Sequence, residues 1–107
     1  MERAARRELR RRGYRILECN VFWAHGEIDI FARHGSTLVV AEVRSYKQGG
    51  MPPRQTLSAD KRRRLRRFGE QWHARSPYRH DPLRLDLVEV MTDDRHRVIG
   101  IEILAGI

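Results

Sequence analysis

Hydrophobic and polar residues alternate over residues 27–33, and this period of two predicts a strand. Its apolar face begins at Ile28 and includes every second residue from there. The opposite face carries Glu27, Asp29 and Phe31, so we expect that face to be polar.

A second strand, expected from Thr37 to Ser45, begins apolar on both faces and ends in charge. Its alternation places Glu42 and Arg44 on one face and Val43 on the other. Charged groups at the end of a buried strand cost several kcal/mol unless they are paired, bound to a metal or solvated in a cleft. Asp29, Glu42 and Arg44 are therefore candidates for a functional site, and a surface salt bridge to Arg44 is the alternative.

The remaining pattern predicts two helices and three further strands around this pair. A short amphipathic helix ends before Gly13, and a longer one starts at the N-cap Ser58 and ends at Ser76 and Pro77. Glycine and proline predict a loop without regular structure over Tyr46–Thr56. We expect helices over 2–12 and 58–75, strands over 14–23 (with a bend or bulge at Asn20), 83–91 and 97–104, and turns over 24–26, 34–36 and 92–96. This order predicts a single domain over residues 1–107, with an α/β fold in which a mixed sheet has a helix packed on each side.

Positive charge is concentrated on the two predicted helices. The formal net charge is +8, and residues 1–15 and 60–75 each carry seven Lys or Arg against two acids, which leaves −2 for the rest. A basic surface favours binding to nucleic acid or another polyanion, and the alternative is that these arginines form ordinary solvated faces. The residues expected to contact phosphates are Arg3, Arg7, Arg10, Lys47, Lys61, Arg62 and Arg66.

The composition of the chain indicates in which compartment the protein works and whether it spans a membrane. No apolar run approaches the roughly 20 residues of a membrane span, and the arginine-rich start has no apolar segment typical of a secretory signal. The lone Cys19 permits no intrachain disulfide, and we expect it to be a small thiol in the core. These observations favour a cytoplasmic protein without a membrane partner.

Two carboxylates at neighbouring strand ends offer the hard oxygen ligands that Mg²⁺ or Mn²⁺ requires. Asp29 and Glu42 are therefore the predicted metal ligands, and Arg44 follows on the same face as Glu42. A divalent ion makes a bound water more acidic, and a neighbouring cation offsets charge on a phosphate. This combination favours phosphodiester hydrolysis.

The segments GEIDIFARHGSTLVVAEVRS, ARRELRRRGYRIL, DKRRRLRRF and LRLDLVEV resemble, in order and spacing, the YraN family of small bacterial proteins. That family is related to archaeal Holliday-junction resolvases and to the PD-(D/E)XK nuclease superfamily. The resemblance implies a restriction-endonuclease-like αβββαββ core with a metal site formed by Glu2, Asp29, Glu42 and Arg44. It also implies that Glu27 supports the site, while Asp86 matches a further motif position.

Two features depart from the nuclease pattern. Arg44 stands at the position of the motif lysine, and an arginine cannot act as a base near neutral pH. Lys47, three residues on, is an alternative source of an ammonium group. The N-terminal helix also begins almost at Glu2, where relatives have several preceding residues.

We therefore expect a nucleic-acid-binding protein with a nuclease-type fold that acts as a Mg²⁺- or Mn²⁺-dependent endonuclease on branched or structured DNA. The alternative is a catalytically inactive module of the same fold that binds nucleic acid or a protein partner. Resolvase-like proteins resemble dimers, because two cuts need two sites, so a homodimer is the expected assembly.

Overall fold

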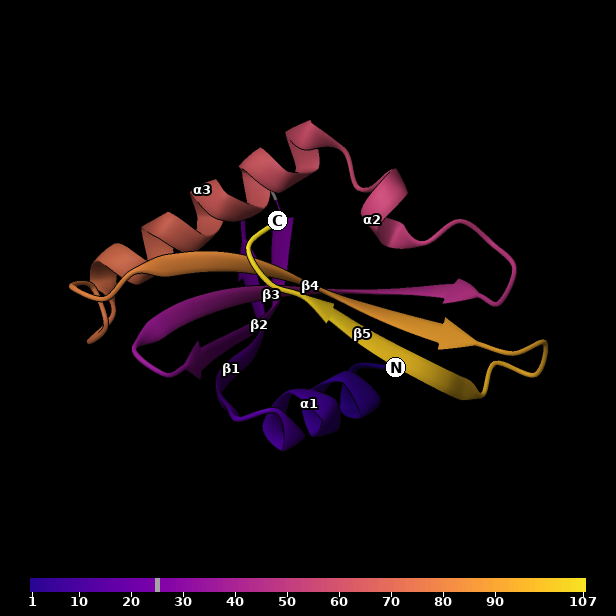
Figure 1. Ribbon diagram of the computed structural model, residues 1–107. Helices are drawn as coiled ribbons and strands as arrows, with labels where there is room; N and C mark the ends of the chain where they lie inside the picture. Colours follow the sequence, from indigo (N-terminus) through magenta and orange to yellow (C-terminus); the bar gives the residue numbers. More distant parts are fainter. Residues whose placement is uncertain (25) are drawn as a thin grey trace.

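The structure is a computed structural model that describes residues 1–24 and 26–107. One five-stranded sheet has the strand order β1-β2-β3-β4-β5, in which only β3 and β4 are parallel neighbours. The predicted mixed α/β fold, with a five-stranded mixed sheet flanked by helices, is confirmed (Figure 1). The elements in chain order are α1 (Glu2–Arg11), β1 (Tyr14–Trp23), β2 (Gly26–His34), β3 (Thr37–Lys47), α2 (Pro53–Thr56), α3 (Ala59–Arg75), β4 (Leu83–Thr92) and β5 (Val98–Leu104).

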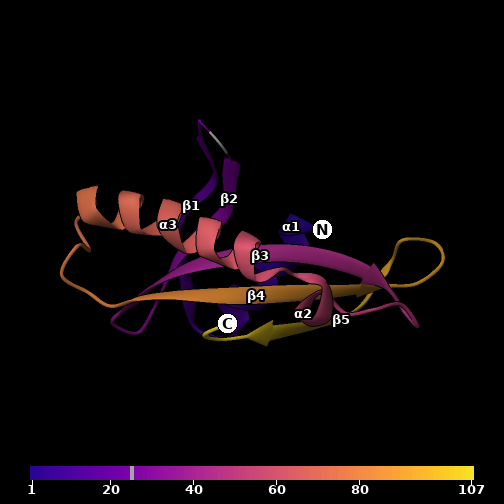
Figure 2. The ribbon, with the colours of Figure 1, turned by 90° about the horizontal axis from the view of Figure 1, so that it is seen from above.

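The two basic helices cover opposite faces of the sheet. Figure 1 shows α1 below the sheet and α2 and α3 above it, and Figure 2 shows α3 crossing the upper face. The apolar side of α1, with Ala5 and Leu9, packs on one buried cluster of the sheet. Leu65 of α3 packs with Phe31 and Val40 in a second cluster on the other face. Among the described residues, no helix is long and apolar enough to cross a bilayer.

Helix α3 starts and ends where its sequence predicts. The Ser58 hydroxyl accepts a hydrogen bond from the Lys61 backbone N–H at 3.1 Å, which caps the first turn. Near the middle of the helix, a Cβ on Gly69 would lie only 2.5 Å from Val40 Cγ2. Glycine therefore lets α3 approach β3 closely at this point.

The prediction of an irregular segment over Tyr46–Thr56 is wrong at both ends. Strand β3 continues to Lys47, and the short helix α2 begins at Pro53, a residue that needs no N–H in a first helical turn. The buried Glu89 fixes α2, because its carboxylate accepts the Arg54 backbone N–H at 2.8 Å and pairs with the Arg54 guanidinium. The segment between β3 and α3 is therefore held in place by Glu89, which lies 35 residues after Arg54 in the sequence.

Two local predictions for β1 and β2 also need correction. Phe31 is fully buried and stacks on Trp72 at 4.1 Å between ring centroids, because α3 covers the face that we expected to be polar. The register of β1 against β2 shifts between Ile16 and Glu18, so the bulge does not lie at Asn20. Asn20 instead adopts a positive φ of 55° within the strand. The turn predicted over 24–26 includes residue 25, which lies outside the described residues.

Candidate functional site

The candidate site begins where β2 and β3 part. Their backbone pairing ends at Ile30 and Ala41, and Asp29 Oδ2 then accepts the Val43 backbone N–H at 2.8 Å. A side-chain carboxylate thus takes over a bond that the next backbone carbonyl would have made in a continuing ladder. This contact fixes Asp29 between the two strands.

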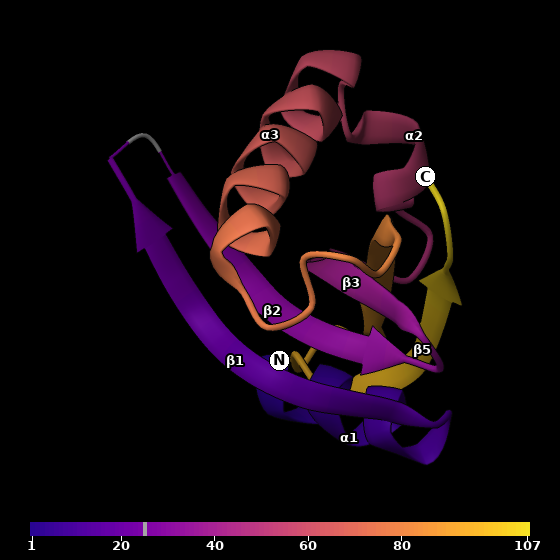
Figure 3. The same ribbon diagram turned by 90° about the vertical axis from the view of Figure 1, so that its left-hand side faces the viewer.

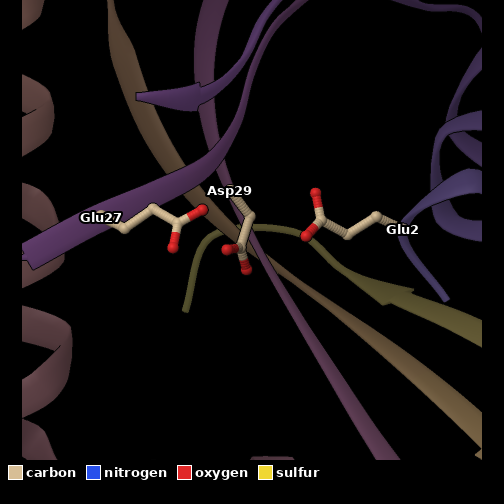
Figure 4. A group of neighbouring side chains, drawn as sticks. All are labelled: Glu2, Glu27 and Asp29. Carbon is tan, nitrogen blue, oxygen red and sulfur yellow. The ribbon is translucent and has the colours of Figure 1, made fainter. Parts of the chain in front are cut away.

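Three acids converge at this position. Glu2 comes from the first turn of α1, and Glu27 and Asp29 come from β2 (Figure 4). One carboxylate oxygen from each lies within 4.8 Å of the others. Within residues 1–24 and 26–107, no Arg or Lys forms an ion pair with any of the three. Burial raises the pKa of Glu2, and the negative charges of Asp29 and Glu27 raise it further.

Asn20 on β1 is a member of this group that the sequence analysis treated only as a bend. With its amide nitrogen turned toward the acids, as the two acceptors require, it donates to Glu2 Oε1 at 3.0 Å and to Glu27 Oε1 at 2.9 Å. Its positive φ is a conformation that asparagine tolerates better than most residues. A residue of low strand propensity inside a strand was the available sequence signal.

Glu42 and Arg44 flank Val43, the β3 residue whose N–H donates to Asp29. Glu42 is only 5% exposed, and Arg44 Nε donates to its Oε2 at 2.9 Å. Burial is the main cause that raises the pKa of Glu42 to about 7, followed by the charge of Asp29 and a hydrogen bond to it, against the opposing effect of Arg44. The predicted ion pair of Arg44 is therefore present, but its carboxylate is buried and is also a neighbour of Asp29.

A polar hollow adjoins this pair. It has a volume of about 210 Å³ and is lined by Arg44, Pro53, Thr56, Leu57, Ser58 and Lys61. The structure thus brings Lys61 of α3 to the same hollow as Arg44, although the two residues are 17 positions apart in the sequence. Lys47, the alternative ammonium group, is exposed at the last position of β3 and does not line this hollow.

The residues expected to contact phosphates do not form one surface. Arg3, Arg7 and Arg10 are exposed on α1, on the opposite side of the sheet from α3. On α3, Arg62 donates to the Arg54 carbonyl at 3.3 Å and Arg66 donates to the Ile107 carbonyl. Part of the positive charge of α3 is therefore committed to contacts within the chain.

Asp86 lies away from the acidic group. It is fully buried, accepts a hydrogen bond from the Tyr14 hydroxyl at 2.7 Å and pairs with Arg84 Nε at 2.8 Å. The Gly106 backbone N–H donates to it at 3.1 Å. These contacts join β1, β4 and the segment after β5, which is a structural role.

Comparison with known proteins finds relatives that match nearly the whole chain. A UPF0102 protein of Moorella thermoacetica is 38% identical over 106 residues, which cover 98% of this chain and 88% of that protein. A UPF0102 protein of Streptomyces coelicolor is 40% identical over 101 residues, which cover 88% of this chain and 75% of that protein. The profile of the uncharacterised protein family UPF0102 matches residues 1–90. The chain therefore belongs to the UPF0102 family, which is the YraN family that its motifs resemble.

Proposed function

We propose that this protein hydrolyses phosphodiester bonds in nucleic acid with the help of a divalent metal ion, on a restriction-endonuclease-like core. The observation that carries the proposal is the convergence of Glu2, Glu27 and Asp29 without an ion pair among the described residues. Three like charges held together raise the free energy of the folded chain unless a cation or protons offset them. A bound cation is the simplest reason for keeping all three.

The donor atoms suit a small, hard ion. Oxygen ligands of octahedral Mg²⁺ or Mn²⁺ lie about 3 to 4 Å apart, and the three carboxylate oxygens lie within 4.8 Å, so small side-chain rotations suffice. Asp29, which lies between Glu2 and Glu27 in Figure 4, would hold the ion together with these two acids, and Glu42 is a neighbouring carboxylate. When bound, the ion would supply an acidified water and offset charge on the phosphate.

The chain's own cations have a separate role. An arginine such as Arg44 can hold a phosphate oxygen but does not serve as a base that removes a proton from water. Lys61, across the same hollow, supplies a second cation at that point. We therefore place the phosphate next to Arg44 and Lys61, with the acids on the far side of Glu42.

Metal binding is tested by Mn²⁺ titration in a calorimeter. The natural chain should bind Mn²⁺, and Asp29→Asn combined with Glu27→Gln should abolish binding. Glu8→Gln is the matched control, because Glu8 lies outside the acidic group and, among the described residues, forms ion pairs with Arg11 and Arg12 alone. Equal binding by the natural chain and the double variant would refute the metal site.

Activity is tested on a panel of branched, single-stranded and linear DNA, with RNA counterparts, in Mg²⁺ and in Mn²⁺. We expect cleavage of branched or otherwise structured DNA by a homodimer, and loss of at least 100-fold in rate in Lys61→Met. An unchanged rate in Lys61→Met would remove Lys61 from the site without touching the metal proposal.

The second candidate function is a catalytically inactive binding module. The observation that favours it is Arg44, which stands at the motif lysine and forms an ion pair with Glu42. If the natural chain binds Mn²⁺ and DNA but does not cut, and Arg44→Lys cuts, the inactive module is the correct description.

A further inference from the structure

Two aromatic pairs under α3 differ in how closely they pack. Trp72, which is partly buried, stacks on the core residue Phe31 at 4.1 Å between ring centroids. Trp23, at the end of β1, lies 6.3 Å from Phe68 at an interplanar angle of 12°, and it belongs to neither buried cluster. Its indole N–H has no hydrogen-bond partner in the described part of the chain. The Trp23 pair therefore lies at the edge of the core.

These rings line an open hollow. Its volume is about 500 Å³, and its lining residues are Trp23, Ala24, Arg64, Arg67, Phe68 and Gln71. We call it the aromatic groove. Arg64 and Arg67 also line a second hollow of about 400 Å³ along α3 with Asp60 and Arg63. The two hollows thus share the same arginines.

The guanidinium groups of the groove are available for a ligand. Arg64 and Arg67 are exposed, and within residues 1–24 and 26–107 neither forms a side-chain hydrogen bond or an ion pair. Arg63 differs, because it pairs with Asp60. An aromatic floor beside two unpaired arginines matches a base together with its phosphate.

The groove also leads to the acidic group. Phe68 packs against Gly26, where a Cβ would lie 2.8 Å from Phe68 Cε2. Gly26 directly precedes Glu27, so Phe68 of the groove packs beside the stretch of β2 that carries Glu27 and Asp29. Figure 3 shows the β1–β2 hairpin curving upward beside α3.

We propose that the aromatic groove binds unpaired nucleotides, with a base stacked on Trp23 and Phe68 and phosphates at Arg64 and Arg67. This inference rests on the proposed function and names its substrate class: nucleic acid with a single-stranded segment next to the bond to be cut. Bases in an intact duplex stack on one another and do not present a face to an aromatic side chain. An acidic protein segment would use the arginines but not the stacking.

The test measures binding without metal, in EDTA at about 100 mM salt, with an oligo-dT of eight nucleotides and with a duplex of equal length. Quenching of tryptophan fluorescence reports stacking, and the signal of Trp72, which is partly buried against Phe31, remains in Trp23→Leu as the reference. We expect the single strand to bind at least tenfold more tightly than the duplex. Trp23→Leu should lose the quenching and about tenfold in affinity, and Trp23→Phe should retain most of the affinity.

The arginines are tested by Arg64→Gln with Arg67→Gln. Loss of two phosphate contacts should lower the slope of log affinity against log salt by about 1.4. Arg79→Gln with Arg95→Gln removes the same charge from exposed positions outside the groove and should leave the slope unchanged. Phe22→Leu is the control for Trp23→Leu, because Phe22 is its neighbour, is 73% exposed and does not line the groove.

Any of three results would refute nucleotide binding in the aromatic groove. The first is equal affinity for the single strand and the duplex, and the second is unchanged affinity in both Trp23→Leu and the arginine variant. The third is tighter binding of an acidic peptide than of the oligonucleotide. The metal proposal fails separately. If Mn²⁺ does not bind but the single strand binds as expected, the metal site is refuted and nucleotide binding in the groove is retained. If Mn²⁺ binds equally to the natural chain and the groove variants while the single strand does not bind, nucleotide binding in the groove is refuted and the metal site is retained.

Discussion

Two groups of carboxylates that are wholly or partly buried lie around this sheet, and the two groups have very different partners. On β4, Asp86 pairs with Arg84 and accepts the Tyr14 hydroxyl, and Glu89 pairs with Arg54 and accepts its backbone N–H. Around Asp29, by contrast, acids mainly face other acids, with Arg44 as their single paired cation among the described residues.

The contrast distinguishes carboxylates that stabilise the fold from those of the candidate site. A buried carboxylate that is paired and hydrogen-bonded on all sides is costly to disturb but needs nothing further. The repulsion between neighbouring carboxylates is offset only by a bound ligand or by protons. Functional sites commonly contain such groups of like charges. The β4 acids hold elements together, and the Asp29 group is where we propose that a cation binds.

Removing a scaffold acid should have the largest effect on stability. Asp86→Ala leaves Arg84 and the Tyr14 hydroxyl without their buried partner, and we expect a loss of about 3 to 5 kcal/mol in the free energy of unfolding. Asp29→Asn should cost less than about 1 kcal/mol, because the amide oxygen still accepts the Val43 N–H and one repelling charge is gone. Urea unfolding measures both, and equal losses would erase the distinction between the two groups.

Mn²⁺ should bring the losses in these two variants closer together. Mn²⁺ at about 100 times its dissociation constant should stabilise the natural chain by about 2.7 kcal/mol. Asp29→Asn should lose that gain, whereas Glu8→Gln should keep it. Thermal unfolding with and without Mn²⁺ shows the difference, and a gain retained in Asp29→Asn would place the ion elsewhere.

Stability should fall as the pH rises from about 4.5 to about 7. The folded chain keeps the Glu42 proton up to a pKa of about 7, whereas the unfolded chain loses it near the ordinary 4.5, so the folded state binds more protons in this range. We expect a decrease of about 1 to 2 kcal/mol, which Glu42→Gln should remove. Unfolding in urea at several pH values measures the slope.

Glu8 provides the opposite sign as a control for this slope. Hydrogen bonds from Arg11 and Arg12 lower the pKa of Glu8 to about 2, so its contribution is lost only as the pH falls below its ordinary 4.5. Glu8→Gln should therefore leave the slope between pH 4.5 and 7 unchanged. A slope that persists in Glu42→Gln would assign the proton to another group.

The last expected effect is small and comes from Asn20. Asn20→Asp replaces a donor to Glu2 and Glu27 by a fourth negative charge, and we expect a loss of about 1 kcal/mol without metal. The same change should increase the stabilisation by Mn²⁺, because it adds an oxygen ligand. Asn20→Gly, which suits the positive φ, controls for the backbone, and a smaller Mn²⁺ effect in Asn20→Asp than in the natural chain would contradict this.

Local patterns predicted most of the fold. The strand over 14–23 and the helix capped by Ser58 lie at their expected positions, because alternation and capping act within a few residues. Helix α2 was missed, since its order depends on Glu89, which is distant in the sequence. The burial of Phe31 was missed for the same reason, because α3 covers its face.

The candidate site was predicted only in part. Charge at the strand ends identified Asp29, Glu42 and Arg44 as a group, and the family resemblance added Glu2 and Glu27. Nothing local connects Lys61 to Arg44, or Trp23 to Arg64, because helix α3 must first dock on the sheet. Residues brought together by such docking carry no spacing that a sequence can show.

The connectivity of the sheet also predicts the order in which the acidic group and the aromatic groove form during folding. The acids come from α1 and from the antiparallel hairpins of residues 14–47, which need only short loops to close. The aromatic groove needs α3, which lies in the long crossover between the parallel strands β3 and β4, and such pairings form slowly. Mn²⁺ should therefore accelerate refolding, whereas an oligonucleotide in the groove should only slow unfolding.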